Sequence, residues 1–169
     1  MSKRVSLRQF QQELSNRLQL ATSQSTVNSR LAIRVGNQKW LIDLADISEV
    51  IAPPPFASVP LTQPWFLGVT NIRGKLYSVV DLPAYVGIGK VQPHASNRLL
   101  MTHPRFATNS ALFVDQALGL RNLDQMHFES SLAESNLAAD CYRDDQGENW
   151  LSINMATLIT DPAFLTVSA

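Results

Sequence analysis

FLGVTNIRGKLYSVVDL occupies residues 66–82 and contains two short, mainly apolar runs around an Arg-Gly pair. The runs cover residues 66–71 and 75–82, and each has the length and composition of a short strand. Arg73 and Gly74 between them form the kind of turn that joins neighbouring strands. This part of the chain therefore predicts a β-hairpin.

The same signal occurs upstream and downstream of this hairpin. Residues 31–35 alternate apolar and other side chains, Gly36 and Asn37 offer a turn, and the alternation resumes at residues 40–44. Three further strands are predicted at residues 97–101, 111–115 and 150–155. Short strands joined by turns indicate an all-β barrel or sandwich.

Helical signals are few. Ser131 and Glu134 form a possible capping box for a short helix after Ser131, and Asp161 followed by Pro162 predicts a helical turn. The connection Pro53–Pro55 lacks three consecutive backbone donors, so we expect an irregular surface segment there. Asp144, Asp145 and Gly147 predict a hairpin turn.

Residues 1–28 differ from the rest of the chain. Apolar residues recur there every three or four positions, as on one face of an amphipathic helix: Leu7, Phe10, Leu14, Leu18 and Ala21. The polar stretch that follows, residues 22–29, has the composition of a linker. We therefore divide the chain into a helical arm with its linker, residues 1–28, and one domain, residues 29–169. Deletion of residues 1–28 is expected to leave that domain folded.

Composition and charge narrow the class of protein. The chain has 169 residues, of which 45% are hydrophobic and 17% charged, as expected of one globular domain. Its 14 Lys and Arg balance 14 Asp and Glu, so no net charge attracts it to nucleic acid or anionic membranes. The single cysteine, Cys141, forms no internal disulfide, which fits the cytoplasm. The N-terminus lacks the apolar run of a secretory signal, and no window is apolar enough for a membrane span.

Catalytic and metal-binding motifs are missing from the sequence. His94, His103 and His127 are isolated, with no second ligand at metal-binding spacing. No Gly-x-Ser-x-Gly motif occurs, and Cys141 has no histidine beside it. We expect a protein that is not an enzyme and uses no cofactor or metal. An active site assembled only by folding stays open as an alternative.

A weak internal repeat links two of the predicted strands. At a constant offset of 73 residues, five residues of the predicted strand 75–82 and its turn match five residues of the predicted strand 150–155 and its turn. The matching residues are Gly74, Tyr77, Val80, Asp81 and Leu82 with Gly147, Trp150, Ile153, Asn154 and Met155. Two similar lobes would explain the match. Chance similarity of two amphipathic strands after a glycine turn explains it equally well.

Two linked motifs resemble the CheW family of chemotaxis coupling proteins. The first, GNQKWLIDLADISEV at residues 36–50, has a glycine turn and an aromatic strand ending Ile-Asp-Leu-x-x-apolar-x-Glu. The second, at residues 66–82, reads Gly-Val-x-Asn-apolar-Arg-Gly and leads into a strand ending Val-Asp-Leu. The resemblance extends from about Leu31 to Ile159. The arm and the phrase VPLTQPWFLG, residues 59–68, resemble the PilI-like branch, which serves type IV pilus twitching motility.

The resemblance implies both a fold and a function. The expected fold is two intertwined five-stranded SH3-like barrels, here preceded by the helical arm. The expected function is that of a cytoplasmic, non-catalytic adaptor between a CheA-type histidine kinase and the cytoplasmic tip of a methyl-accepting chemoreceptor. Such an adaptor reaches membrane receptor arrays only through its partners, without membrane insertion, and binds no nucleic acid.

Motif positions also imply candidate site residues. Three match the family's receptor-binding face: Ile47, Gly68 and Arg73. Three others match supporting positions: Glu49, which can pair with the arginine, Asn71 and Gly74. A small glycine would let a partner helix approach the backbone, isoleucine would add apolar contact area, and arginine offers five directed donors.

Structural alternatives stand beside these roles. Gly68 and Gly74 can serve backbone angles that other residues avoid, Ile47 can lie in the core, and Asn71 can hold a turn. The pair of Arg73 and Glu49 can stabilise the barrel instead of contacting a receptor. A different functional class also stays open, a small β-barrel module that binds single-stranded nucleic acid or a peptide.

Overall fold

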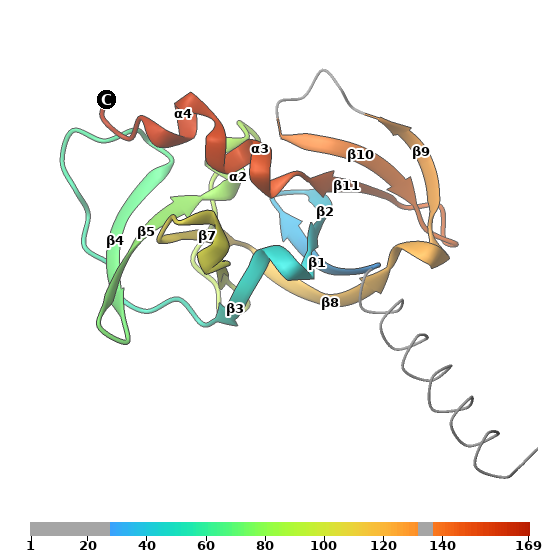
Figure 1. Ribbon diagram of the computed structural model, residues 1–169, viewed down its shortest axis with the longest axis horizontal. Helices are drawn as coiled ribbons and strands as arrows, with labels where there is room; N and C mark the ends of the chain where they lie inside the picture. The colour runs from blue at the N-terminus through green and yellow to red at the C-terminus, as the bar shows by residue number, and fades with distance from the viewer. Residues whose placement is uncertain (1–27, 132–136) are drawn as a thin grey trace, which may run out of the picture.

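The computed structural model describes residues 28–131 and 137–169, which form two β-sheets and a few short helices (Figure 1). The predicted arm, Val5 to Ala21, lies outside the described residues. So do residues 132–136, where the helix after Ser131 was predicted to begin; the chain is a strand from Ala138 onward.

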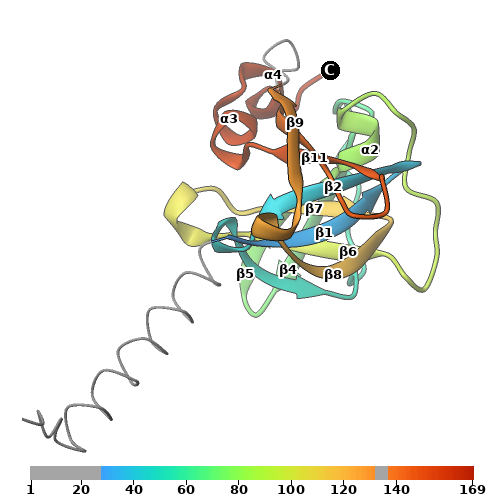
Figure 2. The ribbon, with the colours of Figure 1, turned by 90° about the vertical axis from the view of Figure 1, so that its right-hand side faces the viewer.

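One sheet has six strands, which are β1 (Ser29–Val35), β2 (Gln38–Asp43), β8 (Gln116–Asn122), β9 (His127–Ser131), β10 (Ala138–Arg143) and β11 (Asn149–Ile153). Their order across the sheet is β8-β1-β2-β11-β10-β9. In Figure 2, which views the molecule from the side of this sheet, β9 lies at the front.

The other sheet has five strands, which are β3 (Ile47–Ile51), β4 (Phe66–Ile72), β5 (Lys75–Asp81), β6 (Arg98–Thr102) and β7 (Ser110–Val114). Their order is β3-β6-β7-β5-β4. The described part of the chain also contains three short α-helices, α2 (Leu82–Tyr85), α3 (Met155–Thr160) and α4 (Pro162–Leu165). Three single 3-10 turns connect strands, η1 (Leu44–Asp46), η2 (Pro104–Phe106) and η3 (Leu123–Gln125).

Each sheet combines strands from both halves of the chain. Strand β5 runs parallel to β7, with Val79 opposite Ala111, and β11 runs parallel to β2, with Leu151 opposite Trp40. Parallel neighbours cannot be joined by a tight hairpin, so each of these pairings brings together strands that are distant in sequence. This exchange is consistent with the intertwined arrangement that the family resemblance implies, with β9 as one strand beyond the five expected in that sheet.

The five-stranded sheet curls so that its two edges meet. The chain that leaves β3 returns to the free side of β4, where the backbones of Ala57 and Val69 exchange hydrogen bonds of 2.8 and 2.9 Å. The hydroxyl of Thr70 also donates to the carbonyl of Pro55, at 2.9 Å. Residues 53–55 form no strand, as predicted from their prolines. These contacts are consistent with the predicted barrel.

The described residues form three apolar clusters, the largest of which joins the two sheets. The largest contains residues of both sheets and of α3 and α4, including Ile33, Leu112 and Leu158, each 0% exposed. A second cluster around Leu99 belongs to the five-stranded sheet, and a third around Trp150 belongs to the six-stranded sheet. Burial of an apolar side chain of this size contributes about 1.5–3 kcal/mol to the stability of the folded state. The shared cluster therefore fixes the two sheets against each other.

Capping residues end three predicted strands one or two residues early. The carboxylates of Asp43 and Asp81 accept hydrogen bonds from Ala45 N (2.9 Å) and Ala84 N (3.0 Å), and so start η1 and α2. Asn154 caps α3 in the same way, through Thr157 N at 3.1 Å. The predicted strands therefore stop before Leu44, Leu82 and Met155.

The internal repeat corresponds to a repeated local structure. Gly74 and Gly147 both occupy turns with positive φ, of 82° and 80°. In both copies a strand follows, then a capping side chain, then a short helix whose first residue is buried, Leu82 or Met155. The match between the two stretches is therefore structural.

The hairpin turn at residues 144–148 is held by one carboxylate. Asp144 accepts hydrogen bonds from the Gln146 and Glu148 amides and from the indole Nε1 of Trp150, at 3.0, 2.9 and 2.9 Å. The bond from Trp150, with help from the two amides, holds the pKa of Asp144 below its usual value. The ionised carboxylate is thus tied to a tryptophan that is 1% exposed.

This arrangement predicts a pH-dependent contribution to stability. A lowered carboxyl pKa adds stability that is present above the ordinary aspartate pKa of 3.8 and is lost as the pH falls through the lowered folded value. Asp144→Asn should therefore be less stable than the parent chain at pH 5 to 7, and the difference should shrink below about pH 4. Urea denaturation at each pH measures it. Asp145→Asn, at the exposed neighbour, is the matched control and should show no such convergence.

Candidate functional site

An ion pair joins the β4–β5 turn to β3. The guanidinium of Arg73 donates to both carboxylate oxygens of Glu49, from Nη1 at 2.7 Å and from Nη2 at 2.6 Å. Strands β3 and β4 are the two edge strands of the five-stranded sheet, so this bidentate pair spans its closure. The predicted pairing of the two side chains is confirmed.

The ion pair lies at the surface. The side chain of Arg73 is 73% exposed and that of Glu49 is 33% exposed. The hydrogen bond from Arg73 lowers the pKa of Glu49, and the same bond raises the pKa of Arg73, so both groups stay charged at neutral pH. Exposed pairs of this kind contribute little to stability. The pair orients a cation toward solvent, where a partner can meet it.

The turn that carries Arg73 is shaped by its neighbours. Arg73 itself has a φ of +51° and Gly74 a φ of +82°, both in the left-handed region. The side-chain oxygen of Asn71 accepts a hydrogen bond from the amide of Gly74 at 2.9 Å. Asn71 is therefore the turn-forming residue that the sequence suggests, and Gly74 permits the turn.

Ile47 and Gly68 lie inside the protein. Ile47 is 8% exposed and belongs to the cluster shared by the two sheets. Gly68 is buried with a φ of +138°, and a Cβ built on it would lie 2.0 Å from the carbonyl oxygen of Ala57. The close backbone approach predicted at this glycine is thus made by the chain's own residues, and both positions have the structural role considered above.

Two exposed apolar side chains accompany the ion pair. Val50 follows Glu49 in β3 and is 37% exposed, and Leu76, three residues after Arg73, is 58% exposed. We call Glu49, Val50, Arg73 and Leu76 the hairpin surface. The sequence analysis did not name Val50 and Leu76 as candidate site residues. Alternation shows which residues share a face of a strand, but it does not show which of them are left exposed where the sheet ends. Their apolar character beside a charged turn was the available signal.

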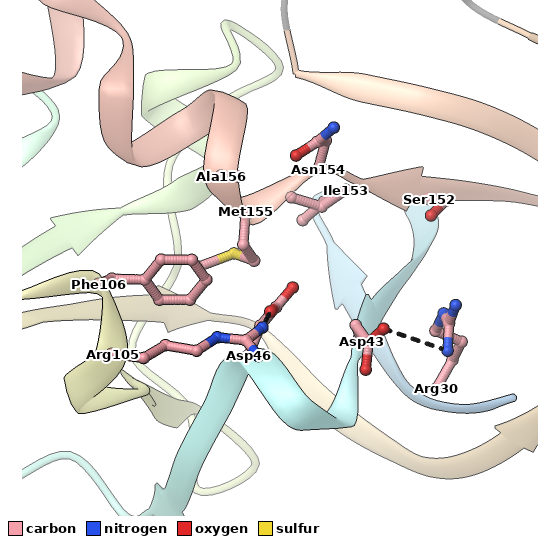
Figure 3. A pocket seen from close by; sticks show the side chains of 10 residues that line it. All are labelled: Arg30, Asp43, Asp46, Arg105, Phe106, Ser152, Ile153, Asn154, Met155 and Ala156. Atoms are coloured by element: carbon pink, nitrogen blue, oxygen red, sulfur yellow. Dashed lines mark hydrogen bonds and ion pairs between the residues drawn. The ribbon is translucent and has the colours of Figure 1, made fainter. Parts of the chain in front are cut away.

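A pocket of about 290 Å³ opens at the junction of the two sheets (Figure 3). Two ion pairs line it: Arg105 with Asp46, and Arg30 with Asp43 at 3.5 Å. Burial raises the pKa of Asp46 even though Arg105 opposes that shift. The contact of Asp46 with Arg105 could not be predicted from local sequence, because Arg105 lies 59 residues away in η2.

Polar and charged side chains make up more than half of the lining of the junction pocket. Its lining comprises Arg30, Asp43, Asp46, Arg105, Phe106, Ser152, Ile153, Asn154, Met155 and Ala156, and so includes no histidine or cysteine. Across residues 28–131 and 137–169, no three His, Cys, Asp or Glu side chains converge as metal ligands would. No helix in the same part of the chain is long and apolar enough to cross a membrane.

Comparison with known proteins gives consistent matches. The profile of the CheW-like domain family matches residues 30–163. The protein PilI of Pseudomonas aeruginosa is 22% identical over 143 residues, which cover 83% of this chain and 80% of PilI. Chemotaxis protein CheW of Helicobacter pylori is 23% identical over 105 residues, covering 60% of this chain and 63% of that protein.

A solved structure shares the fold. The scaffolding protein TtCheW from Thermoanaerobacter tengcongensis superposes with a TM-score of 0.65, at 18% sequence identity. The superposition covers 75% of this chain and 88% of TtCheW. At this identity the likeness bears on the fold alone.

Proposed function

The chain belongs to the CheW-like domain family, and we propose that it is a non-catalytic adaptor that couples a methyl-accepting chemoreceptor to a CheA-type histidine kinase. The observation that carries this proposal is the family match over residues 30–163, which includes both sheets. Coupling requires binding surfaces and no reaction. The exposed ion pair, which offers a charged contact at the surface, is compatible with that role.

We place the receptor contact at the hairpin surface. Arg73 presents its guanidinium while Glu49 fixes its direction, and Val50 and Leu76, exposed residues close to the pair in sequence, would add apolar area. A helical receptor tip with an acidic side chain beside an apolar one would match this pattern. Ile47 and Gly68 then act indirectly, by holding β3 and β4 in place.

The similarity to PilI supports a narrower proposal. PilI matches 83% of this chain, whereas CheW of Helicobacter pylori matches 60% of it. We propose that the adaptor serves a chemosensory pathway that controls type IV pilus twitching motility. It would work in the cytoplasm and reach receptor arrays through its partners.

Charge disfavours the nucleic-acid alternative. Residues 28–169 hold 10 Lys and Arg against 13 Asp and Glu, and so carry a net negative charge. Proteins that bind single strands without sequence preference need a basic groove with stacking aromatic rings. A salt-sensitive gel shift with this chain would argue for that alternative.

A three-component capture experiment tests the coupling role. Immobilised receptor cytoplasmic tip from the same genome is incubated with the kinase regulatory domain, with and without the purified chain. We expect the receptor to retain the kinase domain only when the chain is present, and the chain to bind each partner alone. If the chain binds neither partner, the motifs mark a shared fold only and the proposal fails.

A further inference from the structure

Strand β9 is an exposed edge of the six-stranded sheet. It is the last strand in the sheet order and pairs with β10 on one side. All five of its residues are exposed, and Phe128 is 59% exposed, with its ring edge-on to Tyr142 at 5.8 Å. An open edge with an apolar side chain invites pairing with another chain, and native proteins often cover such an edge with a helix or loop.

The N-terminal segment enters the fold beside this edge. The carbonyl of Asn28 accepts a hydrogen bond from Leu123 N at 3.0 Å, and its side-chain amide donates to Asp124 at 2.7 Å. Both partners belong to η3, which is followed by β9 after a single residue. Whatever precedes Asn28 is therefore tethered close to β9.

The two regions carry opposite charge. Residues 1–27 contain four Lys and Arg and one Glu, a formal charge of +3. Residues 124–148 contain seven Asp and Glu and one Arg, a formal charge of −6. Asp124, Glu129 and Asp145 of this stretch are exposed. A tethered basic segment and an acidic edge attract each other, more strongly at low salt.

We propose that residues 5–21 of the same chain dock as an amphipathic helix over β9. The apolar stripe through Leu14 would pack on Phe128, and Arg8 and Arg17, with Lys3 and Arg4 just before the helix, would face the acidic residues around it. A helix of this length spans about 25 Å, enough to cover a five-residue strand of about 17 Å. The six-residue linker 22–27 reaches up to about 20 Å and keeps the effective concentration high. Docking then prevents edge-to-edge association of copies.

Hydrogen–deuterium exchange on the full chain tests the docking. Leu14→Glu places a charge on the apolar stripe, and Gln12→Glu places the same charge on the opposite face as a matched control. We expect amides of residues 127–131 to exchange about tenfold faster in Leu14→Glu than in the parent chain or the control. Salt at 1 M should reproduce part of that increase. Unchanged exchange of β6 amides would show that the domain stays folded.

Each other outcome overturns the proposal. Equal exchange of residues 127–131 in all three chains would show that the arm does not cover β9. Protection that rises with protein concentration, together with a dimer mass by light scattering, would assign the cover to a second copy. The readout uses the isolated chain, so it does not depend on receptor or kinase binding.

Discussion

Gly68→Ala is expected to lower the free energy of unfolding by about 3–5 kcal/mol. The added methyl would lie 2.0 Å from the carbonyl oxygen of Ala57 and 2.7 Å from its carbonyl carbon, so backbone has to move. That backbone is held by its two hydrogen bonds to Val69, which close the sheet. The φ of +138° at Gly68 adds strain for any residue with a Cβ.

Gly74→Ala is the matched control for this substitution. Gly74 also has a positive φ, of +82°, but nothing lies within 4 Å of the Cβ it would gain. We expect a loss of about 1 kcal/mol there, from backbone strain alone. Urea denaturation of both variants separates the steric effect from the strain. Losses of equal size would mean that the approach of Ala57 to β4 is not a rigid feature of the fold.

Arg73→Glu is expected to weaken binding of the receptor tip at least tenfold, an estimate typical of reversing a contact charge. The result rests on the proposed receptor contact at the hairpin surface. The substitution removes the exposed guanidinium and places a second carboxylate beside Glu49. Because the pair is exposed, the melting temperature should fall by only a few degrees, and binding of the kinase domain should stay largely unchanged. Titration calorimetry with each partner measures both affinities.

Two controls distinguish a contact role from a structural one. Lys75→Glu makes the same charge change two residues away on the same turn, and its effect on receptor binding should be smaller. The double variant Glu49→Arg with Arg73→Glu restores an ion pair but reverses its direction, so it should recover stability without recovering receptor binding. A collapse of the melting temperature in Arg73→Glu, reversed in the double variant, would assign the pair to the fold.

Local sequence signals predicted most strands that have one buried, apolar face, and also the turns between them. The alternation at residues 31–35 and 40–44 predicted the β1–β2 hairpin, which the structure shows as Ser29–Val35 and Gln38–Asp43. The same signal found β4, β5, β6, β7 and β11 to within two residues at each end. It did not predict β3, β8, β9 or β10. Strand β9, for example, is exposed at every position and so has no buried face to alternate with.

Some features of the candidate site were predicted from the sequence, and others depend on segments distant in sequence. Asn71, Gly74 and the pairing of Arg73 with Glu49 were predicted from motif positions, and the geometry of each is present. Ile47 and Gly68 belong to the same two motifs but lie inside the protein, because their surroundings come from segments distant in sequence. Whether the exposed pair contacts a receptor is decided by the binding experiments above.

The sequence by itself determined an all-β domain, its turns and caps, and the two linked motifs that identify the family. These depend on hydrogen bonds and alternation within a few residues, such as the carboxylate of Asp161, which accepts from Ala163 N at 2.9 Å and starts α4. Only the tertiary structure decided that β5 lies beside β7 and β11 beside β2, and that Ala57 closes against Gly68. The physical reason is that side-chain period shows which face of a strand is buried, whereas partners distant in sequence are chosen by packing of the whole core.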